Sequence, residues 1–218
     1  MSMELKVNRQ EIVRYLGYGK NEPGEAVLGQ IDQCVAELLR VSSMKTVNRT
    51  FELKHLSTRE IMLGEMRIES EKLSKHLRNC GKAVLFAATL GPETDLLIRR
   101  WSVADMSRAI VMQASAAAVI EAYCDACQKE LSAQAAGEGL YLRSRFSPGY
   151  GDFPLSYQKE LLALLDAPRR IGLTVTDSMM LTPTKSVTAI MGLTAEKESC
   201  NVHKCASCEA VDCPFRQE

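Results

Sequence analysis

Four cysteines near the C-terminal end of the chain have a spacing typical of a metal centre. They are Cys200, Cys205, Cys208 and Cys213. Two thiolates separated by two residues form a tight chelate, and the flanking cysteines can close around the same ion or cluster. The pattern predicts an iron–sulfur cluster or a zinc site, and His203 could replace one cysteine if the ion is zinc. Free reduced thiols are the alternative that involves no metal.

A loop earlier in the chain offers a second kind of chemistry. It reads Arg145-Phe146-Ser147-Pro148-Gly149-Tyr150. The planar guanidinium of Arg145 suits a carboxylate or phosphate, and Tyr150 adds a ring face and a hydroxyl. Pro148 stiffens the turn, and Gly149 can adopt a positive φ and let a ligand approach the backbone closely. These residues predict a pocket for a small anionic or zwitterionic ligand. The alternative is a surface turn with an exposed arginine.

The elements that must position these two groups follow from hydrophobic periodicity. Apolar residues at helical spacing predict helices over residues 9–18, 25–39, 71–77, 93–101, 105–134 and 156–165. Alternating or continuously apolar runs predict strands over residues 50–53, 66–68, 82–89, 171–175 and 186–191. Ser57 and Glu60 have the spacing of a capping box and predict a helical turn, and Ser156 is a predicted helix cap. Because helices and strands do not alternate regularly, we expect an α+β domain over residues 1–194 and a metal-binding tail over 195–218.

Composition and charge argue against several classes of protein. Lysine plus arginine equals aspartate plus glutamate at 27 each, so the chain has no general attraction to nucleic acid or to anionic membranes. The N-terminal residues lack the apolar core of a signal peptide, and the longest low-charge run, 109–123, is too short to span a bilayer. We therefore expect a cytoplasmic protein without a disulfide framework. For Cys124 and Cys127, in the C-terminal half of a predicted helix, packing in the core or at the surface is the expected role.

The arginine loop resembles the Arg-x-x-Pro-Gly-Tyr motif of the activation domain of cobalamin-dependent methionine synthase. Segments 86–91, 105–121 and 171–192 are similar to the buried strand with its glycine turn, the following helix and the closing segment of that family. The resemblance covers residues 80–193 well and the N-terminal third weakly. Within the family, the chain is most similar to a short, stand-alone branch.

The resemblance implies a curved, C-shaped α+β body with a mixed or antiparallel sheet and packed helices. It further implies that S-adenosylmethionine binds to Arg145, Pro148, Gly149 and Tyr150. Arg145 would hold the methionyl carboxylate, and Tyr150 would line the pocket. The acidic residue that the family uses to bind the amino group of this ligand has no clear match in the sequence. The cobalamin would be supplied by a partner, a corrinoid-binding methyltransferase module.

The function that the resemblance implies is reactivation of a corrinoid (vitamin B12) methyltransferase. Such an enzyme is inactivated when cobalt(I) is oxidised to cobalt(II), and rescue needs one low-potential electron followed by transfer of a methyl group. A cluster at the four cysteines could relay that electron from a low-potential donor, which favours iron–sulfur over zinc, because zinc has no redox chemistry. The chain would then be an accessory module with no catalytic residue of its own.

Two other functions are weighed beside this one. The first is a non-catalytic module that binds a corrinoid protein and carries a structural zinc in its tail. The second is an electron-transfer protein for a different reductive system. Nucleic-acid binding through the tail is disfavoured, because Lys197, Lys204 and Arg216 are too few to form a basic surface.

Overall fold

The strand Lys82–Thr89, labelled β4, is apolar on both faces and lies at the centre of the fold. In the structure, a computed structural model that describes residues 5–19 and 21–196, every residue of β4 after the first is buried. Side chains alternate along a strand, so Phe86 packs in one hydrophobic cluster and Leu85 packs in a second cluster on the other face. A strand of this kind needs apolar cover from both sides.

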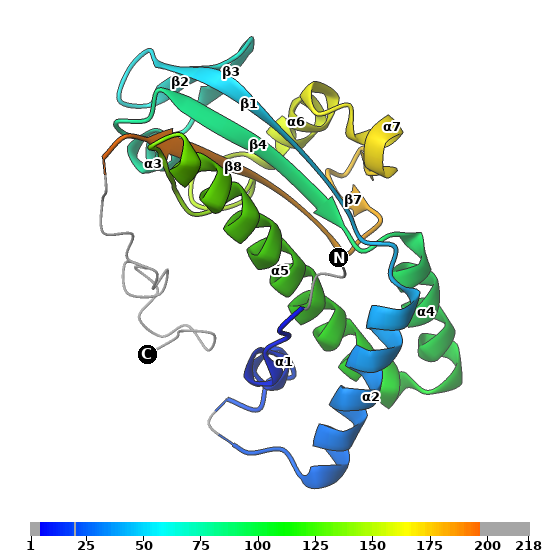
Figure 1. The fold of residues 1–218 in the computed structure, drawn as a ribbon. Coiled ribbons are helices and arrows are strands. Elements are labelled where there is room, and N and C mark those ends of the chain that lie inside the picture. Colours follow the sequence, from blue (N-terminus) through cyan, green and yellow to red (C-terminus); the bar gives the residue numbers. More distant parts are fainter. Residues whose placement is uncertain (1–4, 20, 197–218) are drawn as a thin grey trace.

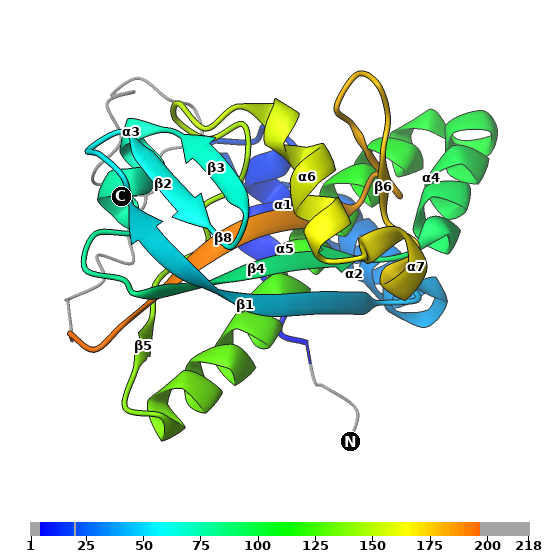
Figure 2. The ribbon, with the colours of Figure 1, turned by 90° about the horizontal axis from the view of Figure 1, so that it is seen from above.

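β4 belongs to a six-stranded sheet in which every neighbouring pair is antiparallel, with the order β3-β2-β1-β4-β8-β5 (Figures 1 and 2). The other strands are β1 (Lys45–His55), β2 (Glu60–Leu63), β3 (Met66–Glu69), β5 (Tyr141–Leu142) and β8 (Ser186–Thr194). β4 pairs with β8 along its whole length, from Lys82 opposite Leu193 to Thr89 opposite Ser186. Two short strands, β6 (Thr174–Val175) and β7 (Leu181–Thr182), form a separate ribbon.

Four helices pack around the first hydrophobic cluster, on one face of the sheet. They are α1 (Arg9–Tyr15), α2 (Glu25–Val41), α4 (Pro92–Ala104) and α5 (Met106–Gly137). α5 is 32 residues long and begins after Asp105, whose carboxylate accepts the backbone N–H of Arg108 at 3.1 Å. By length and composition α5 could cross a membrane, but 61% of its most apolar window is buried inside the fold, as expected for a core helix.

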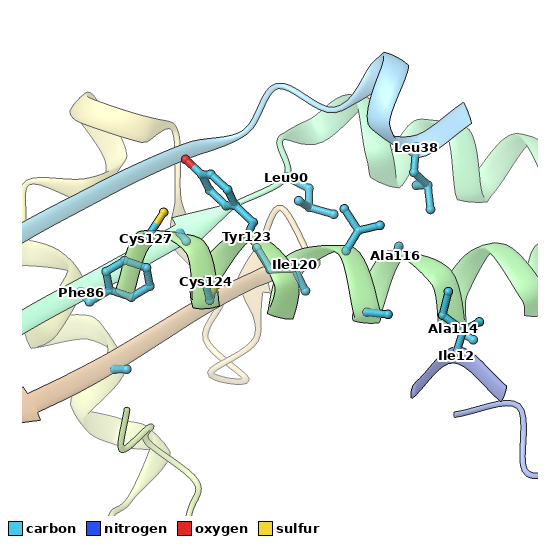
Figure 3. Packing of buried hydrophobic residues seen from close by; sticks show 14 of the residues in the cluster. Ile12, Leu38, Phe86, Leu90, Ala114, Ala116, Ile120, Tyr123, Cys124 and Cys127 are labelled. Atoms are coloured by element: carbon cyan, nitrogen blue, oxygen red, sulfur yellow. The ribbon is translucent and has the colours of Figure 1, made fainter. Parts of the chain in front are cut away.

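The face of α5 that meets the sheet is made of small and apolar side chains. Figure 3 shows Ala116, Ile120, Cys124 and Cys127 in the cluster that also contains Phe86. Both cysteines are buried and free of disulfide bonds, so the packing role expected for this pair is confirmed and lies in the core. Burial raises the pKa of both thiols. They therefore stay protonated and are unreactive as nucleophiles.

The opposite face of the sheet is covered by shorter elements (Figure 2). They are α3 (Glu71–His76), the 3₁₀ turn η1 (Leu155–Tyr157), α6 (Gln158–Leu164) and α7 (Ala167–Ile171). Leu73, Leu161 and Ile171 from these helices join Leu85 and Ile190 of the sheet in the second cluster, to which β2 and β3 also contribute. With helices on both faces of an antiparallel sheet, the predicted α+β class is confirmed.

Three sequence predictions need correction, whereas the other predicted helices and strands are confirmed apart from their ends. Ser57 and Glu60 start no helix, because two successive amides donate to the Glu60 carbonyl and close a turn between β1 and β2. Ser156 lies inside η1, and α6 has no side-chain cap. The predicted strand over residues 171–175 is reduced to β6, because Pro168 occupies the first turn of α7, where a proline is tolerated.

We expect Phe86→Ala to lower the free energy of unfolding by about 3–5 kcal/mol, because it leaves a cavity beside the middle of β4. Denaturant unfolding would measure this change. Leu96→Ala, on the exposed side of α4, is the control and should change stability by no more than about 0.5 kcal/mol. A similarly small effect of Phe86→Ala would show that β4 is not the centre of the core.

Candidate functional site

The segment that follows β5 runs along β8 and carries the predicted loop. The amide of Phe146 donates to the Ile190 carbonyl at 3.0 Å, and the amide of Ile190 donates back to the Phe146 carbonyl at 2.9 Å. Side chains alternate across such a pairing. Phe146 therefore packs in the second cluster, and its neighbour Arg145 points to α5 on the other face. The pairing with β8 thus fixes where Arg145 lies.

The guanidinium of Arg145 is held by three side chains of α5. Nη2 donates to Glu121 Oε2 at 2.9 Å and to Asp125 Oδ1 at 2.7 Å, and Nη1 donates to Gln128 Oε1 at 2.8 Å. These three positions share one face of the helix, because they are spaced by four and three residues. Only 7% of the Arg145 side chain is exposed. The alternative of a surface turn with an exposed arginine is therefore wrong.

Charge around Arg145 is unbalanced. One guanidinium meets two carboxylates, and the side chains of Glu121 and Asp125 remain 47% and 72% exposed. The cluster thus has one negative charge in excess, on groups that solvent reaches. Neither acidic residue was predicted from the sequence. Their spacing on one face of a predicted helix was visible, but the contact with a loop 20 or more residues away was not.

The remaining predicted ligand residues lie in the turn after Phe146. Gly149 has a φ of +90°, which favours glycine, and a Cβ there would press on the Leu155 side chain, 3.0 Å from Cδ2. Tyr150 is half exposed, and its ring contacts Phe146 edge to face, with 5.3 Å between ring centroids. No contact among the described residues joins Tyr150 to Arg145. That one ligand contacts both Tyr150 and Arg145 stays a prediction.

Asp152 and Tyr157 anchor the end of this loop to the β3–α3 junction. The carboxylate of Asp152 accepts from the Ser70 hydroxyl at 2.5 Å and from the amides of Glu71 and Lys72 at 2.7 and 3.1 Å. The Tyr157 hydroxyl accepts from the Glu69 amide at 3.0 Å. Partial burial raises the pKa of Asp152, but these hydrogen bonds outweigh it, and the net pKa lies below its ordinary value.

The four predicted metal ligands, Cys200, Cys205, Cys208 and Cys213, lie outside the described residues. Within residues 5–19 and 21–196, no group of three or more histidine, cysteine, aspartate or glutamate side chains is placed to hold a metal ion. The prediction of a metal centre therefore depends on the spacing of the tail cysteines alone.

Comparisons with known proteins agree with this architecture. The family described as "Vitamin B12 dependent methionine synthase, activation domain" matches residues 78–217, which include both the arginine loop and all four tail cysteines. A solved structure described as the "MetH Reactivation Domain bound to AdoHcy" superposes with a TM-score of 0.62. It is 14% identical, and the match covers 87% of this chain and 77% of that chain, so the likeness is one of fold. No curated protein matches the chain significantly.

We expect Asp152→Asn to destabilise the protein by about 1 kcal/mol or less at neutral pH, because the carboxylate is partly exposed to solvent. The folded-state pKa of Asp152 is lowered, so its contribution is present above the unfolded-state pKa of about 3.9 and is lost as the pH falls through the folded-state pKa. The difference in unfolding free energy between the two proteins should therefore shrink as the pH falls from 7 to 3.

Asp177→Asn is the matched control for this measurement, since Asp177 is fully exposed and contacts only Lys159 among the described ion pairs. It should have no comparable effect. A difference between wild type and Asp152→Asn that persists unchanged at pH 3 would contradict the anchoring role of the carboxylate.

Proposed function

The chain belongs to the activation-domain family of vitamin B12-dependent methionine synthase, and we propose that it reactivates a corrinoid methyltransferase as a separate partner. In this role it binds S-adenosylmethionine and presents it to an oxidised corrinoid on the partner's corrinoid-binding module. The observation that carries the proposal is the family match over residues 78–217, which spans the Arg145 loop. The similar structure described as bound to AdoHcy, the demethylated form of this ligand, adds support.

The charges around Arg145 fit the amino-acid end of S-adenosylmethionine. That end carries a carboxylate and an ammonium group together. The ligand carboxylate would take Nη2 of Arg145 from Glu121 or Asp125, and the released side-chain carboxylate would accept the ammonium group. This exchange keeps the buried guanidinium paired at each stage. It also uses the one negative charge that the cluster has in excess.

The half-exposed ring of Tyr150 offers a face beside the same loop for the remainder of the ligand. Gly149 serves the turn itself, since its positive φ sets the direction in which Tyr150 leaves the loop. Pro148 restricts that turn further. In this arrangement the chain supplies binding and orientation and leaves the reacting cobalt to its partner.

Electron delivery is assigned to the tail. Four thiolates at Cys200, Cys205, Cys208 and Cys213 form a donor set that suits a 4Fe–4S cluster, which when bound would pass on one low-potential electron from an external donor. The electron reduces cobalt(II) to cobalt(I). Methyl transfer from the sulfonium of S-adenosylmethionine to cobalt(I) then restores methylcobalt and leaves S-adenosylhomocysteine. A structural zinc in the tail would leave only the binding role.

We expect Arg145→Ala to weaken S-adenosylmethionine binding by tenfold or more in calorimetric titration, because a hydrogen bond to a charged group contributes about 1.5–3 kcal/mol. Arg145→Lys, which keeps the charge but loses the planar fork, should restore only part of the affinity. Arg169→Ala, an exposed arginine on α7, is the control and should bind normally. Unchanged affinity of Arg145→Ala would remove this residue from the site.

The paired change Glu121→Gln with Asp125→Asn tests the exchange of partners. If these carboxylates receive the ligand's ammonium group, the double variant binds S-adenosylmethionine more weakly than wild type. If they only compete with the ligand for Arg145, the double variant binds more tightly. That second result would contradict the exchange while leaving Arg145 in the site.

For the tail, we expect about four iron and four sulfide per chain in anaerobically purified protein, with a visible absorption that bleaches on reduction. Cys205→Ser with Cys208→Ser should abolish the absorption. Cys34→Ala, which alters a buried core thiol, is the control and should retain it. One zinc per chain and no colour would instead support the non-catalytic binding module.

A further inference from the structure

A polar hollow of about 650 Å³ is lined by residues of α3 and of the end of β1. α3 packs in the second cluster, so the hollow belongs to the opposite face of the sheet from Arg145. Its lining includes the hydroxyl groups of Ser57, Thr58 and Ser74, and no described residue contributes an apolar side chain to it. The size falls within the range of roughly 300–1,000 Å³ that is common for small-molecule sites.

Two cations in the lining have no acidic partner among the described residues. The side chains of Lys75 and Arg78 make no ion pair or hydrogen bond with any residue in the ranges 5–19 and 21–196. Glu71, the carboxylate of the lining, is already paired, because Arg59 Nε donates to it at 3.0 Å. The hollow therefore has a net positive charge, although the chain as a whole is neutral.

The walls of the hollow are held in place by their own hydrogen bonds. His55 Nε2 lies 3.1 Å from the Leu77 carbonyl, which can only accept, so this nitrogen carries the proton. His55 Nδ1 is then free to accept from the Ser74 hydroxyl at 3.4 Å. On the other wall, the Arg59 amide donates to Ser57 Oγ at 3.2 Å and shapes the turn after β1.

The rim of the hollow is also fixed. Asn79 adopts a left-handed backbone with a φ of 61°, and its side-chain amide donates to Glu196 at 2.9 Å. That bond places the Glu196 carboxylate next to Asn79, outside the lining. Lys75 and Arg78 thus remain the charged groups that a ligand entering the hollow would meet without displacing an existing partner.

From this arrangement we infer that the hollow binds a small phosphate-bearing ligand. Arg78 offers a planar fork and Lys75 a point charge to the phosphate oxygens, and the hydroxyls of Thr58 and Ser74 can bond the oxygens that remain. A phosphate ester suits this lining better than a carboxylate, because it carries three acceptor oxygens and a charge of about −1.5 to −2, whereas a carboxylate has two oxygens and a single negative charge.

This inference is independent of the reactivation role. The hollow and the Arg145 cluster lie on different faces of the sheet. Of the lining residues, only Arg78 and Asn79 fall within the range that matches the family. A phosphorylated ligand here would form a second site that could stabilise the α3 region, which also carries the Asp152 anchor of the arginine loop.

The test is calorimetric titration of the full chain with inorganic phosphate, pyrophosphate and ATP in turn, at fixed ionic strength. We expect at least one of the three to bind, with the affinity lowered tenfold or more in Arg78→Gln and in Lys75→Gln. The double variant Arg99→Gln with Arg100→Gln removes two exposed cations from α4 and is the matched control, which should bind as wild type does.

Absence of binding by all three probes would overturn the inference, as would an equal loss of affinity in the α4 control. Vesicles containing phosphatidic acid distinguish a lipid headgroup from a soluble ligand. Sedimentation with these vesicles that pyrophosphate and ATP fail to compete would overturn the assignment to a small soluble ligand. Unchanged S-adenosylmethionine affinity in Arg78→Gln is expected, which separates this site from the reactivation site.

Discussion

The antiparallel pairing of β4 with β8, apolar on both faces, is the constraint on which the remaining structure depends. Because both faces of these strands are apolar, helices must bury each side of the sheet. The long helix α5 contributes most of the helical residues to the cluster on one side. The free side of β8 then pairs with β5 and with Phe146. Alternation across that last pairing directs Arg145 to α5, so the position of the predicted ligand residue follows from the core.

Two regions of the molecule carry local charges of opposite sign. Around Arg145, two carboxylates outnumber one guanidinium, and the excess negative charge suits a ligand that brings both an ammonium and a carboxylate group. On the other face, Lys75 and Arg78 line a hollow whose carboxylate is already neutralised by Arg59. The neutral composition of the chain thus hides local charges of opposite sign. The first region forms where the Arg145 loop meets α5, and in the second the ion pair of Arg59 with Glu71 joins the turn after β1 to α3.

Much of the fold could be predicted from the sequence because long periodic or continuously apolar segments, such as β4 and α5, leave few alternatives. Short elements were missed where local signals conflict: Ser57 and Glu60 read as a capping box, yet backbone bonds there close a hairpin-like turn. The loop motif identified Arg145, but the acidic partners Glu121 and Asp125 could not be found, since only the tertiary pairing of the loop with β8 brings them together.

The central claim, reactivation of a corrinoid, is tested most directly by reductive methylation. A corrinoid-binding module held in the cobalt(II) state would be mixed with the full chain, S-adenosylmethionine and a low-potential reductant under anaerobic conditions, and its visible spectrum followed. The account predicts conversion of the cobalt(II) spectrum to that of methylcobalt only when both the chain and S-adenosylmethionine are present. Conversion at the same rate without the chain, or no conversion with it, would contradict the account.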